Sequence, residues 1–121
     1  MTTTDSHQPS PLLILDIQTG GAATIVRVRG SAGIREAEQM RTVLEQVAMT
    51  QPAVIVLDLS EMDFICSMGL GAIIQSHLRS RHHAGQVRLA NPQPAVQELL
   101  ETTRLTKLFQ IFPTVEQAVR A

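Results

Sequence analysis

The sequence predicts a single α/β domain with a mainly parallel sheet of four to five strands, an opening β-hairpin and about four helices. Its length of 121 residues suits one domain and is long enough to bury a core. Apolar residues make up 44% of the chain and charged residues 17%, a composition typical of a folded protein. Strand-like and helix-like stretches also alternate, which favours a parallel sheet with right-handed crossovers.

The chain is expected to open with a hairpin. Residues 1–10 have little to bury and are predicted to be a flexible tail, so the domain should span residues 11–121. A partly alternating segment, Leu12–Gln18, predicts the first strand, and Gly20-Gly21 predicts a tight turn. Ala23–Arg29 alternates again and predicts the second strand.

The following elements are predicted from apolar period and from turn residues. Gly30–Gly33 is expected to be a loop, and a helix over residues 35–50 is expected after it. The apolar face of this helix consists of Ile34, Ala37, Met40, Leu44 and Val47. The β-branched run Ala53–Leu59 predicts a buried central strand that ends at Ser60.

The second half of the chain continues the alternation of helices and strands. A second helix is predicted to begin near Ser67 and to be closed by Gly85. The remaining elements are a strand at Val87–Ala90, a helix from Pro92 or Pro94, a strand within Leu108–Phe112, and a helix over residues 114–120 with Val115, Ala118 and Val119 facing inward.

Composition excludes several classes of function. Ten basic and eleven acidic residues argue against a dedicated nucleic-acid binder, and three Phe with no Tyr or Trp offer few stacking faces. No apolar run approaches the roughly 20 residues of a membrane span, and the first residues do not resemble a signal peptide. With a single cysteine, Cys66, the chain has no intrachain disulfide, so a cytoplasmic location is expected.

Catalytic and metal-binding patterns are weak. A nucleophilic Cys66 would need a neighbouring base, and the nearest histidine in sequence is His77. A cysteine at this position is more often a small apolar residue that packs at a strand–helix junction. The histidines lack the i, i+4 spacing of a metal pair, and a solvated basic helix end is predicted instead, made of His77, Arg79, Arg81, His82, His83 and Arg88. Gly69-Leu70-Gly71 alone does not make a nucleotide loop, so no cofactor, no metal and no enzymatic activity are expected.

Ser67 is the polar residue of most interest, because it follows the apolar pair Phe64-Ile65 and precedes a helix. Its hydroxyl could simply cap the helix. It is equally placed for phosphorylation, since the added negative charge would lie at the positive end of the helix dipole.

Several motifs in order resemble the STAS domain family, and more narrowly bacterial anti-sigma factor antagonists. The signature stretch consists of Val54–Ser60 followed by Met62–Gly71. Further matches are Gly85–Leu89, Val96–Leu100, Thr103, Leu105, Leu108-Phe109 and Glu116–Ala118, so the resemblance covers about residues 12–120.

The apolar pattern accounts for every predicted element, so a monomeric or weakly dimeric protein is expected. The resemblance implies a protein that binds an anti-sigma factor and thereby frees a sigma factor. The anti-sigma factor of such systems is often a serine kinase that phosphorylates the serine matching Ser67, and a serine phosphatase reverses the step. The partner-binding residues implied are Gly33, Asp63, Cys66, Ser67, Met68, Gly69, Leu70 and Asn91.

This sequence departs from the family pattern at four positions. Cys66 and Gly33 stand where acids are common, Met68 where the residue is small, and Arg104 where a glycine is usual. Two other functions stay open: a non-phosphorylated STAS subunit of an ABC-type lipid-transport complex, and an enzyme that uses Cys66.

Overall fold

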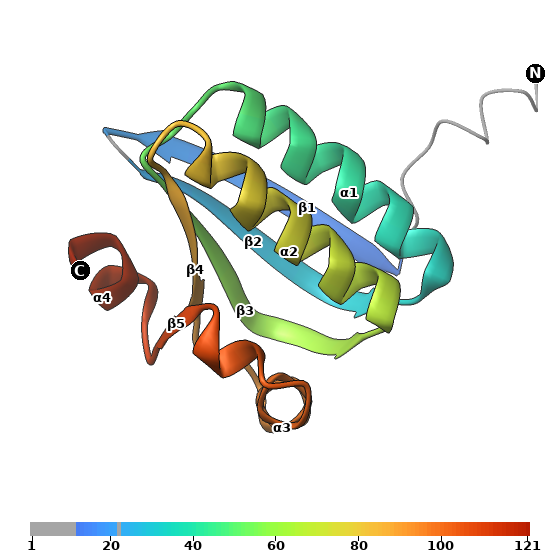
Figure 1. Cartoon of the computed structure of the whole chain (residues 1–121). Helices are drawn as coiled ribbons and strands as arrows, with labels where there is room; N and C mark the ends of the chain where they lie inside the picture. The colour runs from blue at the N-terminus through green and yellow to red at the C-terminus, as the bar shows by residue number, and fades with distance from the viewer. Residues whose placement is uncertain (1–11, 22) are drawn as a thin grey trace, which may run out of the picture.

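The computed structural model describes residues 12–21 and 23–121, and it confirms the predicted single α/β domain (Figure 1). The predicted tail, residues 1–10, lies outside the described residues. The elements, in chain order, are β1 (Leu13–Gly20), β2 (Ala23–Ala32), α1 (Ile34–Met49), β3 (Val54–Ile65), α2 (Ser67–Arg81), β4 (Gln86–Ala90), α3 (Pro94–Thr102), a 3-10 helix (Leu105–Lys107), β5 (Gln110–Phe112) and α4 (Val115–Arg120).

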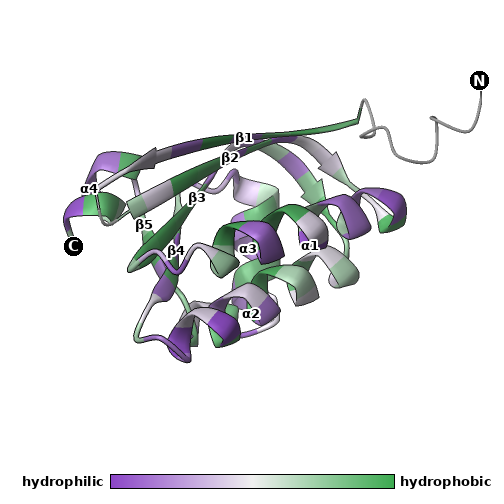
Figure 2. Ribbon diagram, turned by 90° about the horizontal axis from the view of Figure 1, so that it is seen from above, coloured by the Kyte–Doolittle hydropathy of each residue, from purple (hydrophilic) through white to green (hydrophobic). Residues whose placement is uncertain are grey.

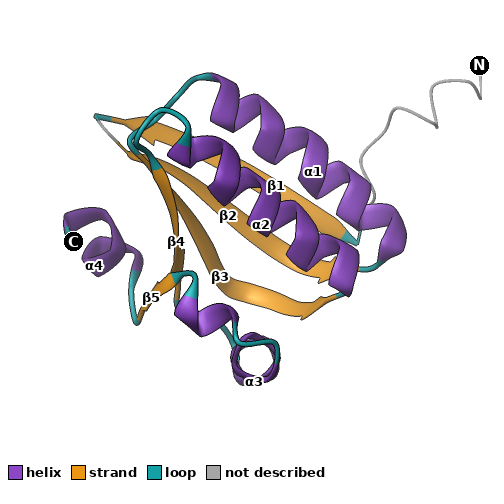
Figure 3. Cartoon of the chain, in the orientation of Figure 1, coloured by secondary structure: helices purple, strands orange, loops and turns teal. Residues whose placement is uncertain are grey.

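The five strands form one sheet in the order β1-β2-β3-β4-β5 (Figure 3). β1 pairs with β2 antiparallel, as the predicted hairpin requires, and the other pairs are parallel. Helices α1 and α2 lie side by side on one face, where Ile55, Leu57 and Leu59 of β3 are buried. On the opposite face, Val56 packs against Ala118 of α4.

Strand β3 is longer than the sequence predicted, because it continues past Ser60 to Ile65. The β3 residues that belong to the main core follow a period of two from Ile55 to Leu59 and then steps of three, to Met62 and Ile65. The pairing with β2 shifts register at the same places, so two bulges keep the apolar side chains on the core face. The predicted loop at residues 30–32 is part of β2 for the same reason, since these residues pair with the bulged end of β3.

Three predicted details of the helices are wrong. Ile34 and Val119 were expected to face the core, but both are exposed, and only Ala118 of α4 is fully buried. Gly85 does not end α2. The left-handed position belongs to Ala84 (φ 64°), and Gly85 is needed because a Cβ there would lie 2.8 Å from the carbonyl oxygen of Pro52.

The predicted basic helix end is only partly solvated. Arg79, Arg81 and His82 are exposed, but His77 and Arg88 are buried. The Nδ1 of His77 accepts a hydrogen bond from the Val87 backbone N–H (3.1 Å), and its ring meets the Phe109 ring edge-on at 5.0 Å. The guanidinium of Arg88 donates to the carbonyl oxygen of Ala118 (2.8 Å), which ties β4 to α4.

The contacts of His77 predict that stability falls in mild acid. Burial, together with the nearby charge of Arg81, lowers the pKa of His77. The unfolded chain therefore binds a proton more readily than the folded one, and stability is lost as the pH falls below about 6.5, by at most about 1.4 kcal/mol per pH unit. Melting curves between pH 7.5 and 5 measure this loss. The His77→Leu variant should show a weaker pH dependence and His82→Gln an unchanged one; equal dependence in all three proteins would contradict the prediction.

Candidate partner-binding site

The candidate site lies at the edge of the sheet where β2 and β3 end and where α1 and α2 begin. The two strands are parallel and finish as a pair, with Ala32 opposite Ile65. The Cys66 N–H then donates to the carbonyl oxygen of Ala32 (2.9 Å), so the two strand–helix junctions are held together. This pairing brings Gly33 and Cys66, which are 33 residues apart in sequence, to neighbouring positions.

Ser67 is not the N-cap of α2, contrary to the simplest expectation. Cys66 has that position, with extended backbone angles (φ −85°, ψ 172°), and Ser67 is the first helical residue. Its side chain is exposed, and its hydroxyl makes no hydrogen bond with any other described residue. Because the first N–H groups of a helix have no intrahelical partner, Ser67 lies among backbone donors that a second molecule can use.

Neither helix is capped by the side chain of its N-cap residue. Gly33 precedes α1, where the Glu36 carboxylate accepts from the Gly33 N–H (3.1 Å). Cys66 precedes α2, and its thiol makes no capping hydrogen bond. The two positions at which the resemblance implies an acid are thus the two N-caps, where an acid would have a structural role as a helix cap.

Replacement of Cys66 by aspartate should therefore stabilise the fold. The backbone at this position already has N-cap geometry, so the carboxylate can accept from the free N–H groups of the first turn. The expected gain is about 1 kcal/mol, or about 3–5 °C in melting temperature for a domain of this size. Calorimetry measures the shift. Cys66→Ala serves as the control and should show no gain; a lower melting temperature for the aspartate variant would contradict the N-cap assignment.

Ser31 and Asp63 connect the two strand ends. The Ser31 hydroxyl donates to a carboxylate oxygen of Asp63 at 2.5 Å. This bond ties the Asp63 carboxylate to β2 on the bulged end of β3. The resemblance implies both Asp63 and the segment Gly30–Gly33 as binding surface, but Ser31 was predicted in a loop, and only the pairing of β2 with β3 shows that it lies in a strand and bonds to Asp63.

Exposed apolar side chains surround this end of the molecule. Phe64 and Met68 are 52% and 54% exposed, and Ile34 at the start of α1 is 70% exposed. Leu12 is also exposed and lies at the same end, since its carbonyl oxygen accepts from the Ser31 N–H (2.8 Å). Phe64 and Met68 lie within the run Asp63–Leu70 that the resemblance implies as binding surface, whereas Leu12 and Ile34 were not predicted there, because their exposure at this end is not visible in the sequence.

The other sequence-predicted residues divide into two groups. Gly69 and Leu70 are buried beneath Ser67, and a Cβ on Gly69 would lie 2.7 Å from Cγ1 of Ile65, so these two residues support the site from below. Asn91 follows β4, which ends level with Asp58. That point is five β2 residues, or about 16 Å, from the end of β3, so the structure does not bring Asn91 to Ser67.

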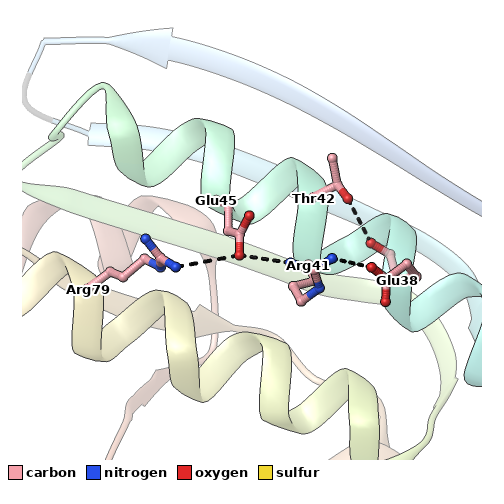
Figure 4. A network of polar contacts seen from close by, with 5 residues as sticks. All are labelled: Glu38, Arg41, Thr42, Glu45 and Arg79. Atoms are coloured by element: carbon pink, nitrogen blue, oxygen red, sulfur yellow. Dashed lines mark hydrogen bonds and ion pairs between the residues drawn. The ribbon is translucent and has the colours of Figure 1, made fainter.

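A polar network fixes the relative position of α1 and α2 (Figure 4). Arg41 bridges Glu38 and Glu45 on α1, and Glu45 also contacts Arg79 of α2 at 3.6 Å. The hydrogen bond from Arg41 lowers the pKa of the Glu38 carboxyl. Because the pairs are exposed, each contributes little stability, but together they link the two helices whose first turns form the site.

The described residues contain neither a cluster of metal ligands nor a membrane-spanning helix. Within residues 12–21 and 23–121, no three His, Cys, Asp or Glu side chains gather in a way that could hold a metal ion. In the same residues, no helix has the length and apolar character needed to cross a membrane.

Comparison with known proteins gives consistent matches. A family model described as the STAS domain matches residues 15–118. The Mycobacterium tuberculosis protein Rv2638, whose name describes an anti-anti-sigma factor, is 27% identical over 101 residues, which cover 82% of this chain and 68% of that protein.

Solved structures share the fold. An anti-sigma factor antagonist from Mycobacterium paratuberculosis has a TM-score of 0.83 at 22% identity, over 93% of this chain and 97% of that one. The Bacillus cell fate determinant SpoIIAA in its phosphorylated form has a TM-score of 0.70 at 18% identity, over 88% of this chain and 97% of that one.

Proposed function

Because the chain belongs to the STAS domain family, we propose that it is an anti-sigma factor antagonist, which binds an anti-sigma factor and so releases a sigma factor. One observation carries the proposal: an exposed, unbonded serine, Ser67, begins α2 and is surrounded by exposed apolar side chains. The relatives named above support the same role.

The surface has the chemistry of a protein-binding site. Burial of Phe64, Met68 and Ile34 against a partner would remove large apolar side chains from water, which favours association. The free N–H groups at the start of α2 and the Asp63 carboxylate supply directional polar contacts around this apolar centre.

Phosphorylation of Ser67 would act on the complex rather than on the fold. The phosphate adds a charge of about −1.5 to −2, which the positive end of the α2 dipole tolerates. In a docked complex the same charge would be buried against apolar side chains, where it is strongly unfavourable. We propose an anti-sigma factor with serine kinase activity as the partner and a serine phosphatase as the enzyme that restores binding.

Binding, rather than catalysis, is the activity that these residues support. A thiol nucleophile at Cys66 would need a neighbouring base. His77 lies eleven residues further on, about 16 Å along α2, and its Nδ1 is occupied by the Val87 N–H.

Calorimetric titration of the purified protein into the anti-sigma factors encoded in the same genome tests the proposal. At least one of them should bind, and with ATP and Mg²⁺ the bound kinase should place a phosphate that mass spectrometry finds on Ser67. Ser67→Ala should still bind and should lose the phosphate. If no anti-sigma factor binds, the proposed function is wrong; if the phosphate persists in Ser67→Ala, the site assignment is wrong.

A further inference from the structure

The outward side of α2 has features that its own fold does not explain. Residues at steps of three and four form one line along the solvent side of the helix. We define the outer face of α2 as Met68, Gly71, Gln75, Leu78 and His82. Met68 and Leu78 are 54% and 45% exposed, so two large apolar side chains of this line face water. Figure 2 shows that the hydrophilic residues of α2 gather in its C-terminal half, whereas those of α1 are spread along its length.

Gly71 is the residue least explained by the fold. A glycine in a helix interior costs about 1 kcal/mol relative to alanine. For Gly69 the fold supplies the reason, since a Cβ would collide with Ile65. A Cβ on Gly71 would meet nothing within 4 Å, and Gly71 does not have a positive φ angle. A glycine on the outside of a helix allows the backbone of another element to approach closely.

The charged side chains that α2 itself contributes have one sign. Helix α2 contains no acidic residue, and Arg79 and Arg81 lie on either side of Leu78. Arg79 contacts Glu45 of α1 at 3.6 Å (Figure 4), and the Arg81 guanidinium makes no ion pair with a described residue. The C-terminal half of the outer face is therefore suited to a partner that carries carboxylates.

We propose that a helix of the anti-sigma factor packs lengthwise on the outer face of α2. The apolar side chains of the partner helix would lie over Met68 and Leu78, and its backbone would approach α2 closely at Gly71. The acidic side chains of the partner helix would face Arg79 and Arg81. The inference rests on the proposed function for the identity of the partner, and it extends the binding surface about 15 Å beyond Ser67. A second copy of the chain fits less well, because α2 packed on α2 would meet no acidic residue of that helix.

Two variants of the outer face test the contact against the anti-sigma factor that binds the wild type. Gly71→Ala should raise the melting temperature, because alanine favours the helix and fits without a clash, and it should weaken binding at least tenfold. Leu78→Glu should keep the fold, since the carboxylate lies between two arginines, and should also weaken binding at least tenfold. Met49→Glu, at a residue of α1 that is 76% exposed, is the matched control and should bind as the wild type does.

A photo-crosslinking amino acid in place of Gln75, expressed in the native cell, separates this inference from the proposed function. A crosslink that maps to an acidic helical segment of the anti-sigma factor, and that Leu78→Glu abolishes, is the expected result. The same photo-crosslinking amino acid in place of Gln46 on α1 should give no crosslink to the anti-sigma factor.

The unfavourable outcomes are distinct. If the anti-sigma factor binds both outer-face variants normally and Gln75 gives no crosslink, the inference is overturned and the proposed function stands. If the crosslink instead maps to a different protein, the choice of the anti-sigma factor as occupant of this face is overturned, and the proposed function is still judged by the titration described above. A crosslink to a second copy of the chain overturns the choice of partner.

Discussion

Ser67→Glu should weaken binding to the anti-sigma factor roughly a hundredfold while the melting temperature stays within about 2 °C of the wild type. In the free protein the carboxylate is exposed at the first turn of α2, where a helix dipole favours an anion by about 0.3–1 kcal/mol. In the complex it would be buried beside Phe64 and Met68 without a partner of opposite charge, and a penalty of about 3 kcal/mol corresponds to the hundredfold loss. Calorimetry measures both quantities on the same samples.

Gln46→Glu is the control for this variant, because it adds the same charge to the exposed side of α1, away from the site. It should bind as tightly as the wild type. Unchanged affinity of Ser67→Glu would exclude a phosphorylation switch at this residue and would leave the protein a constitutive binding module.

Gly30→Ala should cause the largest loss of stability, at least about 3 kcal/mol, or about 10 °C in melting temperature. Gly30 has a φ of 108°, which side-chain-bearing residues rarely adopt, and a Cβ there would lie 2.1 Å from the carbonyl oxygen of Leu12. The obstructing atom belongs to the backbone, so β1 and β2 would have to separate to make room. Thermal and urea denaturation measure the loss.

Gly20→Ala is the matched control in the same hairpin. A Cβ on Gly20 would meet nothing within 4 Å and its φ is not positive, so the change should stay within about 0.5 kcal/mol. An unaltered melting temperature for Gly30→Ala would mean that the close approach of β1 to β2 at Leu12 is not maintained in solution.

Ser67→Glu and Gly30→Ala change two parts of the molecule, and the sequence predicts the first part better than the second. The run from Asp63 to Leu70 was predicted as binding surface from a family resemblance, which could be seen in the sequence because the motif that carries it is a run of neighbouring residues at the start of a helix. The hairpin around Gly20 was equally visible, since its turn residues and its alternation are local signals. By contrast, nothing in the local pattern indicates that Gly30 must pass so close to Leu12.

The polar and charged residues show the same division. His77 and Arg88 resemble surface residues in sequence, yet both are buried, where His77 accepts from a backbone N–H of β4 and Arg88 donates to a carbonyl oxygen of α4. Ser67 has the residue type of an N-cap, but the pairing of Cys66 with Ala32 sets the start of α2 one residue earlier. In each case the deciding partner is distant in sequence.

By itself, the sequence determined the fold class, the order of strands and helices, and the serine that begins α2, because apolar period and turn residues act over a few neighbouring positions. Only the tertiary structure decided where β3 ends. Two bulges in its pairing with β2 change the spacing of its core residues from two to three, and a spacing of three in the sequence does not indicate a strand. The paired ends of β2 and β3 then place Leu12, Ser31 and Ile34 at the same end of the molecule as Ser67. Exposure and proximity depend on which strands pair, and that pairing is a property of the whole chain.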